Sequence, residues 1–201
     1  TTTKPINGRG SGTRSEFCEH TKFDLKPLLP LIDGNYSGLT LKEHPTFWFY
    51  VPYKTESISS GKFVLQDNEE NAIYELSFKL PKSPGFISIS IPNTAKPLEK
   101  NKPYKWKLRL DCASKTSDTP FDFTQGWIQR VELANLETQL RTAKPEERVK
   151  LYIENKIWYD AASDFANNQK NQEAWFKLLK AVGLEQLKQE PICGSVVPVE
   201  R

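Results

Sequence analysis

The sequence contains no methionine, only three cysteines and only two histidines. There is no Cys-x-x-Cys pair, so the usual ligands of a zinc site are too few, and we expect no metal and no other cofactor. No apolar run approaches the roughly 20 residues that a membrane-crossing helix needs, which predicts no transmembrane segment. The formal net charge is only +3, with basic residues scattered among acids, which argues against a nucleic acid as the partner.

Strings that are typical of catalytic sites are also missing, including G-x-S-x-G, H-E-x-x-H and the P-loop. His44 and Pro45 lie at a predicted bend without a motif partner, so we interpret both as structural, with the imidazole bonded to a backbone group. The opposing hypothesis is a hydrolase of envelope polymer that uses Asp160 and Glu154 near Tyr159. Two carboxyls can do that chemistry only across a cleft, whereas both residues flank a predicted helix turn, where a capping role is expected.

What the sequence does contain is a series of short alternating runs, which predicts an immunoglobulin-like antiparallel β-sandwich over residues 18–134. Residues 39–53 have apolar side chains at both parities, so this strand must be covered on two sides. The predicted strands are 39–41 and 46–53 (one strand with a bend at 43–45), 61–66, 72–80, 86–91, 104–112 and 121–133, with an edge segment at 23–32 and a kink at Gly126. The fold class is therefore α+β and mainly β.

The hydrophobic period changes after residue 134, and residues 135–190 read as short helices. The expected helices are 136–143, one that begins at Pro145, 157–168, 174–182 and a last turn at 184–189, with Asn155 in the left-handed conformation that ends a helix. We expect this helical subdomain to dock on the sandwich; the alternative is a separate helical domain. Residues 1–17 read as a flexible Gly-rich lead, and residues 191–201 as an extended tail.

Four large aromatic residues are candidates for binding. Trp48, Tyr50, Tyr53 and Trp127 could line an exposed platform that suits a sugar or a partner protein. The opposing interpretation, which we favour because large aromatics are mostly buried, places them in the core under the helices. A sheet edge is a further candidate, through strand addition.

The cysteines bear on the compartment of the protein. Cys112 has the inward parity of its strand, and Cys18 follows the Gly-rich lead. We hypothesise a Cys18–Cys112 disulfide, which would close a long loop. Spacing alone leaves two buried thiols as the alternative. Cys193 lies in a tail bounded by Pro and Gly and looks unpaired.

The string HPTFWFYVPY at residues 44–53 resembles the hallmark of the family called domain of unknown function 928, found in photosynthetic bacteria. FVLQD at 63–67, GWIQRV at 126–131, IWYDA at 157–161 and the cysteines at 18 and 112 also resemble its motifs, so the resemblance covers nearly the whole chain. Lys156 stands where the family has a turn glycine. The resemblance implies an exported protein and favours the disulfide, but it implies no reaction.

The sequence therefore favours a non-enzymatic, exported structural or binding module of the periplasm, cell surface or extracellular space, with its signal peptide already removed. Its partner would be a second copy, another envelope protein or a polysaccharide, reached through the lead or a sheet edge. The alternatives are the hydrolase described above and an accessory carbohydrate-binding protein.

Overall fold

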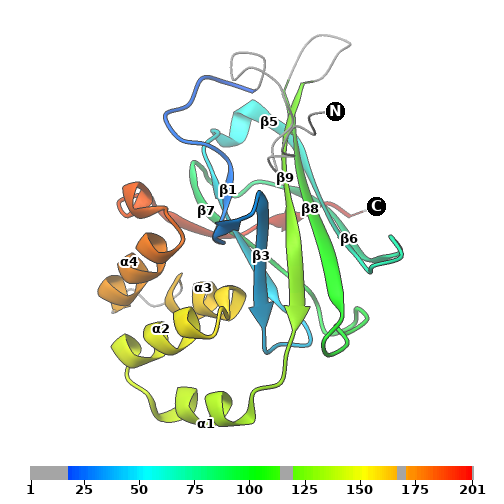
Figure 1. Ribbon diagram of the computed structural model, residues 1–201. Coiled ribbons are helices and arrows are strands. Elements are labelled where there is room, and N and C mark those ends of the chain that lie inside the picture. Colours follow the sequence, from blue (N-terminus) through cyan, green and yellow to red (C-terminus); the bar gives the residue numbers. More distant parts are fainter. Residues whose placement is uncertain (1–17, 114–119, 167–170, 201) are drawn as a thin grey trace, which may run out of the picture.

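The computed structural model describes residues 18–113, 120–166 and 171–200, and the predicted lead at 1–17 lies outside them. Within these residues the chain forms a four-stranded sheet A, a seven-stranded sheet B and a set of short helices (Figure 1). The protein is therefore α+β and mainly β, as predicted.

The elements have the following bounds. Sheet A contains β1 (Lys26–Pro27), β4 (Thr46–Val51), β7 (Gly85–Ser90) and β10 (Ile192–Ser195). Sheet B contains β2 (Leu31–Ile32), β3 (Asn35–Thr40), β5 (Ile58–Gln66), β6 (Ala72–Lys79), β8 (Pro103–Cys112), β9 (Phe121–Arg130) and β11 (Val197–Pro198). The helices are α1 (Ala134–Thr142), α2 (Pro145–Glu154), α3 (Trp158–Ala166) and α4 (Gln172–Ala181), with 3-10 turns η2 (Thr55–Ser57) and η4 (Glu185–Leu187).

The sheets are mixed, which differs from the antiparallel sandwich that we expected. The strand orders are β1-β4-β7-β10 in sheet A and β11-β6-β5-β8-β9-β3-β2 in sheet B. The β3–β9 and β7–β10 pairs are parallel, whereas β5–β6 and β8–β9 form antiparallel pairs. Antiparallel partners can be joined by a tight turn, but the parallel partners here are distant in sequence, so no local signal could reveal them.

The bend at 43–45 does more than interrupt a strand. It carries the chain from β3 in sheet B to β4 in sheet A, so residues 39–41 and 46–53 do not form one strand. The alternation of residues predicts which side chains share one face of a strand. It does not predict which sheet each half joins, because the pairing partners come from elsewhere in the chain.

The core between the sheets is aromatic, and one parity of β4 faces it. Phe47 lies 4.8 Å from Phe63 between ring centroids, and Phe49 lies 5.3 Å from Trp106, so β4 of sheet A faces β5 and β8 of sheet B. A Cβ on Gly126 would lie 2.4 Å from the Trp106 ring, and β9 pairs there without a register shift. Gly126 therefore allows a close ring approach rather than the predicted kink.

The opposite parity of β4 faces the helices. The Trp48 indole donates a hydrogen bond to Ser163 of α3 at 3.1 Å, and Trp175 of α4 meets Phe86 of β7 at 5.1 Å between ring centroids. Helices α2 to α4 lie on one side of the body, and β6 and β8 of sheet B lie on the other (Figure 1). Sheet A is therefore covered on both faces, while the outer face of sheet B carries no helix among the described residues.

Candidate functional site

The outer face of sheet B brings a row of cations beside a row of aromatic rings. Alternation points Lys105, Lys107 and Arg109 of β8 away from the core, as the sequence pattern predicts. On the neighbouring strand β9, Phe121, Phe123 and Trp127 point the same way. The register places Lys105 opposite Trp127 and Arg109 opposite Phe123. We call these six residues, together with Lys62, the sheet B face.

Rings and cations on this face are in contact. The Arg109 guanidinium lies 3.9 Å from the centroid of the Phe121 ring, and the Lys105 ammonium lies 5.7 Å from that of Trp127. Such cation–π contacts are worth roughly 0.5–1 kcal/mol at exposed sites and hold the rings in place. Lys62 of β5 pairs across from Arg109 and extends the basic row.

A buried hydrogen-bond chain fixes β9 beneath this face. The Trp106 indole donates to the Tyr159 hydroxyl at 2.8 Å, and that hydroxyl donates to the Trp127 carbonyl at 2.7 Å. Burial raises the pKa of Tyr159, so the phenol stays protonated and keeps its donor. Helix α3 thereby holds the backbone of Trp127, which is the one predicted binding residue that reaches the surface.

The other three predicted binding residues are core residues. Trp48, Tyr50 and Tyr53 are 4%, 2% and 2% exposed, against 37% for Trp127. The Tyr53 hydroxyl donates to Asp122 at 2.6 Å. Burial, and then the nearby Glu190 carboxylate, raise the pKa of Tyr50. These four residues therefore do not form one exposed platform. Trp48 and Tyr50 lie at the parity of β4 that faces the helices, whereas Tyr53 lies at the other parity and reaches Asp122 of β9.

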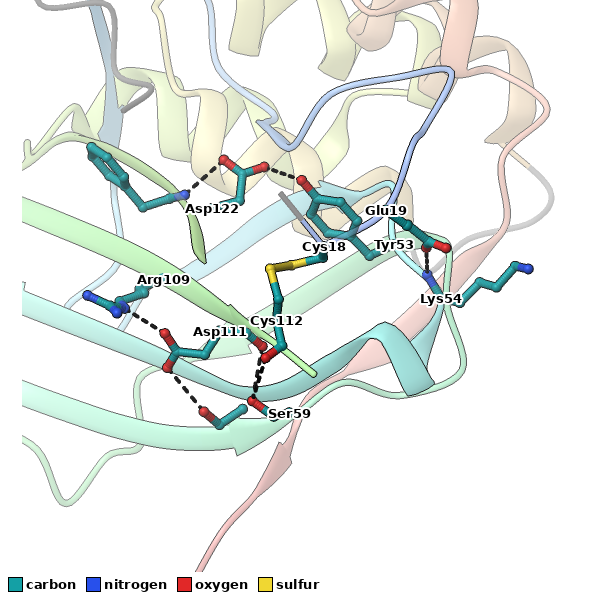
Figure 2. The surroundings of a disulfide bond; sticks show 11 residues. Cys18, Glu19, Tyr53, Lys54, Ser59, Arg109, Asp111, Cys112 and Asp122 are labelled. Atoms are coloured by element: carbon teal, nitrogen blue, oxygen red, sulfur yellow. Dashed lines mark hydrogen bonds and ion pairs between the residues drawn. A yellow bond between two sulfur atoms is a disulfide. The ribbon is translucent and has the colours of Figure 1, made fainter. Parts of the chain in front are cut away.

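The predicted disulfide is present. Cys18 and Cys112 are bonded, with 4.7 Å between their Cα atoms, and they join the segment before β1 to the end of β8 (Figure 2). The Glu19 carboxylate next to Cys18 accepts a hydrogen bond from the Lys54 backbone amide at 2.7 Å, so a second contact also ties this segment to the body. Cys193 is a free thiol, as expected.

His44 and Pro45 make backbone contacts at the crossover between the sheets. The Nε2 atom of His44 lies 2.9 Å from the Ala95 carbonyl oxygen, and the Pro45 carbonyl accepts a hydrogen bond from the Ile91 amide at 3.0 Å. These contacts suit the structural role that we predicted for both residues.

The two carboxylates of the hydrolase hypothesis do not face each other. Asp160 is buried and accepts hydrogen bonds from the Thr40 hydroxyl at 2.5 Å and the Leu41 amide at 2.9 Å. Burial raises the pKa of its carboxyl, against the lowering effect of these two donors. Glu154 is exposed and lies 3.8 Å from Lys150 on the surface of α2. Glycoside chemistry needs both carboxyls across one cleft, so this pair cannot perform it.

A cleft of about 760 Å³ lies between the crossover and helices α1 to α3, and its lining includes the paired side chains of Arg148 and Asp164. Arg148 binds Asp164 through two hydrogen bonds of 2.9 and 2.8 Å, and the Tyr152 hydroxyl donates to the same carboxylate at 3.1 Å. Burial, followed by the Asp164 charge, raises the pKa of Tyr152. These contacts join α2 to α3 and engage the Arg148 guanidinium and the Asp164 carboxylate.

A second cleft of about 860 Å³ contains the free Cys193. Burial and the neighbouring Glu190 raise the pKa of this thiol, which lowers its thiolate fraction at neutral pH and makes it a poor nucleophile. Across the described ranges, no three His, Cys, Asp or Glu side chains are grouped to hold a metal, and no helix is long and apolar enough to cross a membrane.

The model of the family described as Domain of Unknown Function (DUF928) matches residues 9–192. The chain belongs to the DUF928 family. No curated protein and no solved structure matches this DUF928 chain. The assignment of family therefore brings no activity with it, and the function must be argued from the chain's own residues.

One turn of this DUF928 protein differs from what we predicted. Lys156 has the positive φ of 60°, while Asn155 has φ −98°. The Ile157 amide bonds the Tyr152 carbonyl at 3.0 Å, so the helix-ending turn requires the left-handed residue one position after Asn155. The prediction for Asn155 is therefore wrong. Its side chain instead donates to the Leu151 carbonyl at 2.8 Å, which ties it back to α2.

Sequence reasoning named only Trp127 of the sheet B face. The outward parity of Lys105, Lys107 and Arg109 was visible in the sequence, but their closeness to Phe121 and Phe123 depends on the β8–β9 register. The signal that could have revealed this face is the pair of neighbouring strands in the sequence, one with Lys-x-Lys-x-Arg at outward positions and the next with aromatic residues at alternate positions.

Proposed function

We propose that this protein is an exported, non-enzymatic binding module of the cell envelope that contacts its partner through the sheet B face. The observation that carries the proposal is the row of cation–ring contacts on the face of sheet B that no described helix covers. A sheet held rigid by its ladder presents such side chains at fixed spacing, which lowers the entropic cost of binding.

Export is supported by the Cys18–Cys112 disulfide. Disulfides form and persist in oxidising compartments such as the periplasm and the extracellular space, and they are rare in reducing ones. The bond here joins two segments far apart in the sequence, which is the arrangement that stabilises most in the loop-entropy account.

A non-enzymatic role is supported by what the acids and histidine of the helical side do. Asp160, Asp164 and His44 each bind a structural partner, and the Thr40 hydroxyl that donates to Asp160 is fully buried, out of reach of a substrate. Catalysis needs a positioned acid, base or nucleophile with capacity left for a substrate.

The face is favoured over a sheet edge because the edges are blunted. The edge strands β1, β2 and β11 have two residues each, and β1 and β11 contain Pro27 and Pro198. The fourth edge strand, β10, has four residues and a register shift between Ile192 and Gly194. Short edges with proline resist the addition of another strand, since proline offers no ladder donor. Self-assembly through an edge therefore has less support than binding on the face.

Retention on envelope material tests the proposal. The oxidised protein is mixed with washed envelopes of the organism that makes it, and the fraction that sediments is measured. The face variant is Lys107→Glu with Arg109→Glu. The control, Lys150→Glu with Lys177→Glu on α2 and α4, makes the same change in net charge, and the Arg109 and Lys177 side chains are equally exposed at 49%.

We expect the unmodified protein and the control to sediment with the envelopes, while the face variant stays in solution. Equal retention of both variants, or no retention of the unmodified protein, would refute the proposed surface. Cell fractionation tests the compartment: recovery of the protein in the cytosol with Cys18 and Cys112 reduced would rule out export.

A further inference from the structure

The geometry of the sheet B face also narrows the chemical class of the partner. We propose that this face binds an acidic polysaccharide, a polymer whose sugar rings carry carboxylate groups. The inference rests on the proposed function, because it names the ligand of the same surface.

The aromatic row suits a chain of sugar rings. Phe121, Phe123 and Trp127 share one face of β9, and their outermost members are six residues apart, which is about 20 Å at a rise of roughly 3.3 Å per residue. The C–H faces of pyranose rings pack against aromatic rings, as other apolar groups do. A polymer lying along β9 would therefore meet rings at more than one of its sugars.

The basic row suits carboxylates on those sugars. Lys105, Lys107 and Arg109 lie on β8, one strand spacing of about 4.8 Å from β9. A uronate polymer stacked on the rings of β9 would place its carboxylates within reach of these cations. Arg109 donates its Nε–H to Asp111, and its Nη groups can donate two hydrogen bonds to one carboxylate, which adds geometric selectivity.

Charge complementarity favours an anionic occupant over a neutral one. The outward charges of β5, β6 and β8 include Lys62, Lys79, Lys105, Lys107 and Arg109 against Glu75 and Asp111. Asp111 accepts a hydrogen bond from Arg109 at 2.8 Å, at the end of the row, so the remaining length is basic. A basic strip on a low-dielectric body concentrates polyanions at its surface.

A polysaccharide fits this strip better than a nucleic acid does. The whole chain carries a net charge of only +3 with a pI near 8.6, and nucleic-acid binders usually carry a stronger basic field. Under the proposed function, moreover, the disulfide-bonded protein works outside the cytosol, in the envelope, where polysaccharide is the abundant polyanion.

Affinity electrophoresis of the oxidised protein tests the inference. The gel contains polygalacturonate, or the same polymer fully methyl-esterified, which keeps the sugar rings and removes the charge. The face variant is Lys105→Ala with Trp127→Ala. The matched control is Phe176→Ala with Lys188→Ala on the helical side, where a ring that is 36% exposed lies 5.2 Å from a lysine, close to the 37% and 5.7 Å of the face pair.

We expect polygalacturonate to retard the unmodified protein and the control alike, with binding that weakens by roughly tenfold in the face variant. The esterified polymer should cause little retardation, and roughly 1 M salt should abolish the effect of the acidic one.

Three results would overturn the inference. They are no retardation by polygalacturonate, equal retardation of the face variant and the control, and equally strong, Trp127-dependent retardation by single-stranded DNA. If polygalacturonate fails while envelopes still retain the protein through Lys107 and Arg109, the polysaccharide inference falls and the proposed function stands. If envelopes also fail to retain it, the proposed function falls with it.

Discussion

Loss of the Cys18–Cys112 disulfide should strongly lower the free energy of unfolding, and the substitution that tests this is Cys18→Ala. The bond joins residues 94 positions apart. The chain-entropy model gives about 4.7 kcal/mol at 25 °C for a loop of this size. Cys18 is only half-buried, so its truncation adds little cavity cost, and the expected loss is dominated by the freed unfolded chain.

Urea unfolding followed by tryptophan fluorescence measures this loss. The five tryptophans provide the signal. The slope of free energy against urea should rise in the variant, because a denatured chain without the cross-link exposes more surface. Cys193→Ala is the control: it removes a thiol that forms no disulfide, and it should cost less than about 1 kcal/mol.

The reasoning would be refuted if Cys18→Ala lost less than about 1 kcal/mol with an unchanged slope. That result would mean that the unfolded chain is not constrained by the bond, and that the segment before β1 is held by its other contacts, such as the Glu19 bond to the Lys54 amide.

Three further predictions concern the buried network and the sheet packing. Tyr159→Phe leaves the Trp106 indole and the Trp127 carbonyl without this buried partner and should cost roughly 2–4 kcal/mol in urea unfolding; a cost near zero would contradict it. Gly126→Ala places a Cβ at 2.4 Å from Trp106 and should cost roughly 1–3 kcal/mol, measured by thermal unfolding against wild type. The raised pKa of Asp160 means that its contribution to stability is full below the unfolded pKa of about 3.9 and is lost as pH rises through the folded pKa. The stability of wild type relative to Asp160→Asn should therefore fall with rising pH, and parallel profiles would contradict this.

The parts of the fold that sequence predicts well are those with a local cause. Strand β8 was predicted over residues 104–112, with Trp106, Leu108 and Leu110 inward, and all three are fully buried. Helix α2 begins at Pro145 as expected, because proline fits the first helical turn. In both elements the signal lies within a few residues of the structure that it specifies.

The parts that sequence misses depend on distant partners. Nothing near residues 42–45 shows that the chain changes sheets there, or that β3 pairs in parallel with β9. Trp48 and Trp127 look alike in sequence, since each alternates with apolar neighbours on a strand. One is covered by α3 and the other is exposed, so the difference follows from which sheet the helices cover.

The tail at residues 192–198 has a consequence for how the protein matures. It supplies β10 at an edge of sheet A and β11 at an edge of sheet B, so both sheets are completed by the same segment. Ribosomes make chains from the amino end, and β6 and β7 therefore emerge long before their last partners. Until that segment arrives, both sheets keep an open border.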